Sequence, residues 1–329
     1  MKKILQVLIS LLLAAFLFWL VYRNMDFSKL ADVFRSGLCY WWILASVVFN
    51  VLSNVLRGLM WSQLVKPVCP EVRKKSAILA VFVSYAANLL FPRAGEVVRC
   101  GVLKKQDGAS FSKTFGTVIT ERILDMLCLL LIAVLAVVLQ IGFFNKFFHE
   151  NPDSLARVLK VVTSPYIWGS LATLAVAFFL LKNWFKQTPF LEKTRILIRK
   201  IWDGMKSIKT LERPFVFIVY IILIWVLYFL MFYVGRFFFP FDIPLGFLPM
   251  LGAFVMGSLG ILAPVQGGIG AYHFMVIYTL TFFGIGRPEA AIFALVIHGL
   301  QTIQSLLFGL IAWLWLSAED HKKRRITIF

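Results

Sequence analysis

One break in an apolar stretch gathers residues that suit phosphate chemistry. Segment 88–99 contains Asn88, Pro92, Arg93, Gly95, Glu96 and Arg99. Pro92 removes a backbone donor and ends a helix, and Gly95 permits a turn that other residues resist. On a helix beginning near residue 94, Glu96 and Arg99 share a face and are positioned to pair. The break predicts a cradle in which arginine offers planar paired donors to a phosphate; the alternative is a loop with solvated charges.

A second charged group, Glu121, Arg122 and Asp125, lies near the start of a long apolar helix. Ionisable side chains within a membrane span are costly, and by default they indicate function. The alternative is an Arg122–Asp125 pair that holds the end of its own helix. That pair leaves Glu121 without a partner, so we expect it to reach Arg93 or Arg99.

A polar stripe follows one helix face at Asn50, Asn54, Arg57 and Trp61, with spacings of four, three and four residues. All four side chains therefore lie on the same side of the helix. Arg57 is not expected to face lipid unless its side chain extends to the membrane–water interface. Asn54 and Arg57 are therefore candidate binding residues. Hydrogen bonding between helices is the competing explanation.

A glycine-rich turn follows Pro264 and contains Gly267, Gly268 and Gly270, with His273 just beyond it. Free backbone amides before a helix attract anions. His273 titrates near neutrality and would help to attract phosphate when protonated, unless it only fills a polar niche. His298, on the last span, is positioned either to line the same cavity or to bond to a neighbour.

Composition indicates that these residues sit in a membrane. Hydrophobic residues make up 60% of the 329-residue chain and charged residues 15%, against about 25% charged in soluble domains. The net charge is +18, and it lies between apolar segments, so we expect anionic lipid headgroups at the inner leaflet as partners and no nucleic acid. The four cysteines show no metal spacing, and no metal or other cofactor is expected.

The basic loops predict how the chain crosses the membrane. Nine apolar segments are present, but nine crossings would place basic loops on both sides, against the positive-inside rule. The rule is satisfied if 76–104 and 247–285 are re-entrant helical hairpins. We therefore predict an all-α polytopic protein of about six full spans plus two hairpins, in the cytoplasmic (inner) membrane, with both termini cytoplasmic. The spans are 4–22, 41–65, 117–141, 165–182, 214–239 and 288–317.

The chain is predicted to form a single transmembrane domain, 1–329. The hairpins share Leu-x-Pro-x-x-Gly and suggest an inverted-topology repeat with halves 41–141 and 214–317. Between the halves, 183–213 is expected to be a basic amphipathic connector on the inner leaflet, and 318–329 a basic cytoplasmic tail. Segment 4–22 is expected to be a retained helix, because residues 21–24 lack the small side chains of a signal-peptide cleavage site.

Taken in order, the three motifs resemble the flippase-like membrane domain of lysylphosphatidylglycerol synthases. They are Asn88…Pro92-Arg93-x-Gly95-Glu96…Arg99, Glu121-Arg122-x-x-Asp125 and Pro264-x-x-Gly267-Gly268-x-Gly270. The resemblance covers almost the whole chain and implies lipid translocation. The soluble aminoacyltransferase domain of the two-part enzymes is lacking, and His273 stands where the resemblance leads us to expect Glu.

The leading hypothesis is a flippase or transporter for an anionic or zwitterionic phospholipid or lipid-linked headgroup. The sequence shows no Walker loop, so a gradient or downstream consumption would supply the energy. Two alternatives stay open: a membrane-embedded transferase acting on a lipid-linked substrate, and a non-catalytic subunit of a lipid-modifying complex. Enzymatic activity is therefore not the first expectation.

Overall fold

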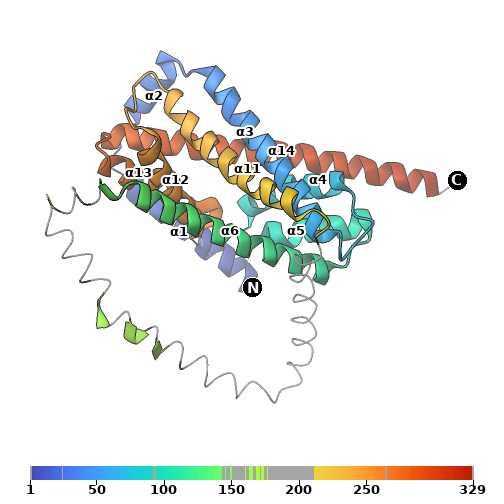
Figure 1. The fold of residues 1–329 in the computed structure, drawn as a ribbon. Helices are drawn as coiled ribbons and strands as arrows, with labels where there is room; N and C mark the ends of the chain where they lie inside the picture. Colours follow the sequence, from blue (N-terminus) through green and yellow to red (C-terminus); the bar gives the residue numbers. More distant parts are fainter. Residues whose placement is uncertain are drawn as a thin grey trace.

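A computed structural model describes residues 2–23, 25–91, 94–142, 211–263 and 265–327, together with scattered residues between 145 and 176. Every regular element in these ranges is helical (Figure 1). The helices are α1 (Lys2–Tyr22), α2 (Phe27–Ser36), α3 (Tyr40–Val65), α4 (Lys74–Leu90), α5 (Ala94–Asp107), α6 (Phe111–Leu139), α11 (Pro214–Tyr233), η3 (Val234–Phe237), α12 (Phe247–Ile261), η4 (Gln266–Gly268), α13 (Ala271–Phe282) and α14 (Arg287–Thr327).

Four of the described helices are long and apolar enough to cross a membrane, namely α3, α6, α11 continued by η3, and α14 up to Glu319. They match the spans predicted over 41–65, 117–141, 214–239 and 288–317. The predicted span 4–22 forms α1, whose described apolar part is Leu11–Tyr22. Segments 165–182 and 183–213 lie largely outside the described residues. The chain is an all-α, multi-pass membrane protein, as predicted.

Both predicted hairpins form as pairs of packed helices that are shorter than the roughly 20 residues a crossing needs. In the first hairpin α4 has 17 residues and α5 has 14. Arg73 Nε, before α4, donates to Asp107 Oδ1, at the end of α5, over 2.7 Å. The hairpin therefore returns to the end of the molecule from which it starts. In the second hairpin α12 has 15 residues and α13 has 12.

Glycines let the two arms of each hairpin approach closely. A Cβ on Gly95 of α5 would overlap the carbonyl oxygen of Ser84 on α4. In the second hairpin, a Cβ on Gly260 of α12 would lie 2.8 Å from the Cα of Tyr272 on α13. Both positions thus require the absence of a side chain, and larger residues there would separate the arms.

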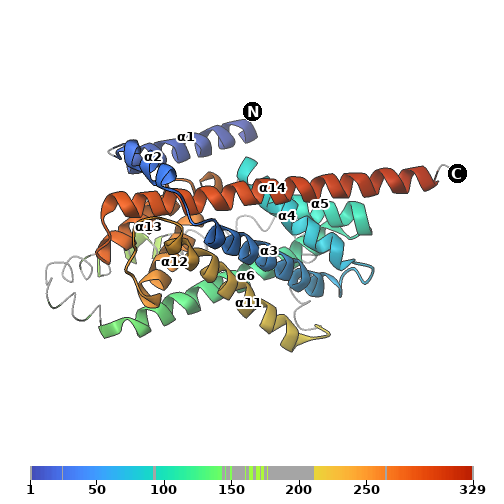
Figure 2. The same ribbon diagram turned by 90° about the horizontal axis from the view of Figure 1, so that it is seen from above.

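The packing of the two halves is reciprocal. Helices α3 and α11 pack side by side, and the hairpins lie toward opposite ends of this pair (Figures 1 and 2). The last helix of each half then packs on the first arm of the other half's hairpin: α14 on α4, and α6 on α12. This exchange is the packing that repeats related by a two-fold axis would give. The inverted-topology repeat and its boundaries stay a prediction.

Candidate functional site

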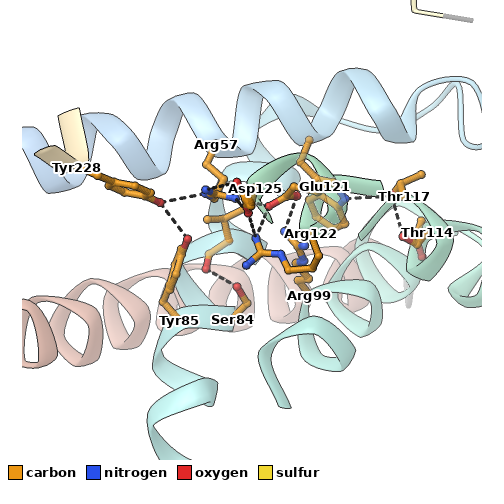
Figure 3. Close-up of polar contacts among 12 residues, drawn as sticks. Arg57, Ser84, Tyr85, Arg99, Thr114, Thr117, Glu121, Arg122, Asp125 and Tyr228 are labelled. Carbon is orange, nitrogen blue, oxygen red and sulfur yellow. Dashed lines mark hydrogen bonds and ion pairs between the residues drawn. The ribbon is translucent and has the colours of Figure 1, made fainter. Parts of the chain in front are cut away.

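Five charged side chains from three helices meet between the first hairpin and the spans beside it (Figure 3). We call them the ion cluster: Arg57 of α3, Arg99 of α5, and Glu121, Arg122 and Asp125 of α6. Arg57 holds Asp125 with two parallel bonds, Nη1 to Oδ2 at 2.9 Å and Nη2 to Oδ1 at 3.0 Å. This fork geometry fixes both side chains.

Glu121 is the centre of the ion cluster. Its Oε1 accepts bonds of 2.6 Å from both Arg57 Nη1 and Arg122 Nη2, and its Oε2 accepts one of 2.8 Å from Arg99 Nη1. The side chain is 0% exposed. A carboxylate at such depth is tolerated only when it is paired and hydrogen-bonded. The expected pairing of Glu121 with Arg99 is therefore present, together with the Arg122–Asp125 pair at 3.0 Å.

Two tyrosines complete the environment of Arg57. Its Nε donates to the hydroxyl of Tyr228 on α11 over 3.0 Å, and this hydroxyl shares a further 3.0 Å bond with Tyr85 on α4 (Figure 3). All three nitrogens of the Arg57 guanidinium are thus engaged by protein groups. Arg57 joins α3, α6 and α11, and it has no donor group left without a partner.

Arg99 differs from Arg57 because much of its guanidinium is unpartnered. It stacks 4.7 Å above the ring of Trp61, whose own Nε1 is tied to Thr117 Oγ1 over 3.0 Å. Only Nη1 is bonded, while Nε and Nη2 are buried without a partner. One turn earlier on α5, Glu96 Oε2 is also buried and unpartnered. Other buried polar atoms of the described residues also lack a partner, Arg122 Nε and Arg236 Nε among them, but of these arginines Arg99 has two such nitrogens on one edge, which leaves room for a ligand or water.

The polar stripe on α3 divides between the ion cluster and the bundle interior. Arg57 belongs to the ion cluster, and the ring of Trp61 packs against Arg99 of the same cluster. Asn50 donates through its side-chain amide to Gln304 Oε1 on α14, and Asn54 Nδ2 donates to the Asn50 carbonyl over 2.9 Å. Asn54 therefore binds its own helix and lies outside the ion cluster.

The two hairpin tips touch each other. Gln266 Nε2, in the glycine-rich turn, donates to the carbonyl of Leu89 over 2.6 Å and also to that of Leu90 at the end of α4. Those carbonyls have no partner within the helix because α4 ends there. The tip of the second hairpin thus caps the tip of the first, and we call this contact the tip latch.

The predicted residues of the glycine-rich turn form a separate group. His298 Nε2 lies 2.8 Å from the Gly267 carbonyl, and the Gly270 amide donates to His273 Nδ1 over 3.1 Å. Gly268 donates its own amide to Val265 O over 3.3 Å. Two of the amides expected to meet an anion therefore already bond to protein. Gly267, Gly268 and Gly270 all have positive φ, at 58°, 75° and 83°, which favours glycine.

Not every predicted residue joins one of these groups. Asn88 Oδ1 accepts the Gly95 amide over 2.7 Å and so holds the first hairpin's turn. Pro92 and Arg93 lie outside the described residues. Among the residues that the structure describes, no group of three or more His, Cys, Asp and Glu side chains is placed to hold a metal ion.

Sequence reasoning missed Tyr85, Tyr228 and Gln266. Tyr228 lies in α11, which has no charged residue to mark it, and its partner Arg57 is 171 positions away. Gln266 lies inside the glycine-rich motif, between Val265 and Gly267. Its only sequence feature that could have indicated a role is a polar side chain at a helix break.

Comparisons with known proteins agree with the helical architecture. The family model described as "Lysylphosphatidylglycerol synthase TM region" matches residues 7–309. A UPF0104 membrane protein of Methanothermobacter thermautotrophicus is 25% identical over 76% of this chain and 78% of its own length. A UPF0104 membrane protein of Pyrococcus horikoshii is 30% identical over 41% of this chain and 40% of its own.

A third similar protein is named glycosyltransferase AglD, from Haloferax volcanii, with 34% identity over 30% of this chain. The match spans only 16% of that protein. No solved structure matches the chain. Because the family model covers nearly the whole sequence, and the motifs it spans build the ion cluster, the chain belongs to the family of the lysylphosphatidylglycerol synthase transmembrane region.

Proposed function

We propose that this protein is a flippase that moves a phospholipid or lipid-linked molecule with an anionic or zwitterionic headgroup across the cytoplasmic membrane. The observation that carries the proposal is the unpartnered edge of Arg99. Nε and Nη2 lie on the same side of a guanidinium, and together they form the fork that grips two oxygens of a phosphate. In Arg99 this edge is buried and has no protein partner.

The charge balance of the ion cluster supports an anionic group at this edge. Three arginines face two carboxylates, so the five ion-paired residues carry a net charge of 3 − 2 = +1. This excess of positive charge, only part of which is exposed at Arg122, would attract a phosphate. The nearby Glu96 Oε2 is unpartnered as well. A zwitterionic headgroup would satisfy both groups, with phosphate at Arg99 and an amine at Glu96.

The tip latch supports a path between the two hairpins. Each hairpin is too short to cross, so the two tips meet inside the bundle rather than at its ends, and Gln266 joins them. Under the proposal, the headgroup enters beside Arg99 when the latch is closed and passes when the tips separate. Opening one hairpin at a time would expose the site to one side of the membrane and then to the other.

Reconstituted liposomes test the proposal. Wild-type protein is expected to move fluorescent phospholipids between leaflets, and Arg99→Lys is expected to slow this by about 10- to 100-fold, because a hydrogen bond to a charged group contributes ~1.5–3 kcal/mol. Arg236→Lys is the matched control, since Arg236 also stacks on an aromatic ring, 5.0 Å from Phe237, outside the ion cluster. Equal rates in wild type and Arg99→Lys would overturn the assignment.

A membrane-embedded transferase is the second candidate, supported by the stretch shared with the protein named glycosyltransferase AglD. The same liposomes distinguish the two functions. Extracted lipids are analysed by mass spectrometry after incubation with lipid-linked donors. A new lipid species that disappears in Glu96→Gln, which changes a buried carboxylate oxygen without a partner, but persists in Glu212→Gln would favour the transferase, whereas movement without new species supports the flippase.

A further inference from the structure

A groove of about 260 Å³ runs along the outer side of the first hairpin, between α5 and the second half of α14. Figure 2 shows α14 passing beside α4 and α5 at this end of the molecule. The α5 wall contains Val98, Gly101 and Val102, and the α14 wall contains Trp313 and Leu316. Lys105 lines the groove about one turn beyond Gly101, toward the basic loops.

The groove is distinct from the ion cluster. Val98, Val102 and Lys105 recur at spacings of four and three residues, so they share one face of α5. Arg99 lies about 100° around the helix from Val98, and it points to Glu121 on α6. A molecule in the groove would therefore contact neither the unpartnered edge of Arg99 nor the tip latch.

The walls of the groove pack on each other through Val98, Val102 and Leu316, and further contacts fix them at both ends. Toward the hairpin tip, α14 approaches α4 so closely that a Cβ on Gly309 would overlap Ala86. Toward the loops, Lys75 of α4 pairs with Glu319 and lies 4.6 Å above the ring of Trp315, both on α14. Between these contacts a Cβ on Gly101 would meet nothing within 4 Å. The groove is therefore open at Gly101, which has no side chain to fill the space.

We propose that this groove binds one anionic phospholipid of the leaflet next to the basic loops, as a resident lipid that is not transported. Its walls are largely apolar, with Val98, Val102, Trp313 and Leu316, and they suit an acyl chain. A lysine at the loop end places positive charge at headgroup level, where each Lys attracts anionic lipid. Lys104 adds charge at the same end of the hairpin, so the site favours an anionic over a zwitterionic headgroup.

Native mass spectrometry of the purified full-length chain with phosphatidylglycerol or phosphatidylcholine tests the site. Gly101→Phe should fill the groove and lower phosphatidylglycerol retention at least about tenfold. Gly299→Phe is the matched control, because Gly299 is on α14 outside the groove and a Cβ there also meets nothing within 4 Å. Lys105→Gln should weaken phosphatidylglycerol binding about fivefold and leave phosphatidylcholine binding unchanged.

Equal phosphatidylglycerol retention in Gly101→Phe and Gly299→Phe would overturn the proposal. If Gly101→Phe does not fold, Lys105→Gln decides: an unchanged preference for phosphatidylglycerol overturns the site. Arg99→Lys separates this lipid from a transported one, and it should keep the bound phosphatidylglycerol. Loss of that lipid in Arg99→Lys would show that the retained molecule occupies the ion cluster, which also overturns the proposal while leaving the flippase assignment intact.

Discussion

Gln266 donates its side-chain amide to the backbone carbonyl of Leu89 across the meeting point of the two hairpins. The two residues are 177 positions apart in the sequence and belong to different halves of the molecule. A side chain from one half thus completes the hydrogen bonding of a helix end in the other. Any separation of the tips must break this bond first, so its strength contributes to the barrier for opening.

Gln266→Leu should therefore accelerate lipid movement. Losing a net hydrogen bond of ~1 kcal/mol from the closed state lowers the opening barrier and raises the rate by up to about fivefold. Rates per reconstituted protein in liposomes give the measurement. Gln140→Leu is the control, because the Gln140 side chain bonds only to the Ala136 carbonyl of its own helix, over 3.0 Å. Unchanged rates with a lower unfolding temperature would make Gln266 purely structural.

Glu121→Gln should strongly destabilise the protein, because three arginines would then share one carboxylate. Removing one partner from a buried ion pair costs about 3–5 kcal/mol in unfolding free energy. Thermal unfolding in detergent gives the readout. Glu212→Gln is the control: Glu212 pairs with Lys66 at 2.7 Å, but both side chains are about half exposed or more, and such pairs contribute ~0–1 kcal/mol. Equal shifts for both variants would contradict the central role of Glu121.

Tyr228→Phe should lower stability and transport more than Tyr85→Phe. The Tyr228 hydroxyl accepts directly from Arg57 Nε, and its loss leaves that buried donor unpaired at a cost of about 1–3 kcal/mol. Tyr85 contacts only the Tyr228 hydroxyl in this chain of bonds. A double-mutant cycle with unfolding free energies measures the coupling. Additive effects would mean that the two hydroxyls act independently.

His273→Gln should leave the shape of the transport profile between pH 6 and 7.5 unchanged. The ring accepts the Gly270 amide at Nδ1, packs edge-on against Phe18 and Tyr22, and is 2% exposed. An accepting nitrogen carries no proton, so protonation would break the bond that shapes the turn. Transport that rises toward pH 6 in wild type, with a flat profile in His273→Gln, would instead assign His273 a role in attracting phosphate.

Residues 66–75, 99–116 and 183–213 and the C-terminus should all face the cytoplasm. Cysteines introduced at positions 105 and 200 should resist a membrane-impermeant thiol reagent in intact cells. The exposed native Cys39, between α2 and α3, is the internal control and should react from outside. Reaction at position 105 with protection of Cys39 would reverse the proposed orientation.

Local patterns predict α1, the four long spans and both hairpins, but they did not predict α2. Proline and glycine positions placed both hairpin turns, because these residues act on their immediate backbone. Spacing along one helix also placed Arg57 inside the bundle and paired Arg122 with Asp125. Such contacts depend only on helical periodicity.

Contacts between segments that are far apart in the sequence were harder to predict. The sequence predicts that Glu121 pairs with Arg93 or Arg99, and the pair with Arg99 is present. It does not predict the bond from Arg57 to the same carboxylate. Glu96 was expected to pair with Arg99 on its own helix, yet Arg99 reaches Glu121 on α6. A guanidinium can satisfy partners on several helices, and only the packing of those helices decides among them.

Helix α1 has no counterpart in either half, and its contacts are one-sided. Gly270 approaches α1 so closely that a Cβ there would overlap Leu17, and Tyr22 donates to the Ala291 carbonyl on α14 over 3.3 Å. Both partners belong to the second half. Suppose that each half adopts the other's conformation during transport. The contacts of α14 with α4 and of α6 with α12 would then replace one another, whereas the contacts of α1 with the second half would have no equivalent in the first. The resting population of inward- and outward-facing molecules would then be set by a helix outside the predicted repeat.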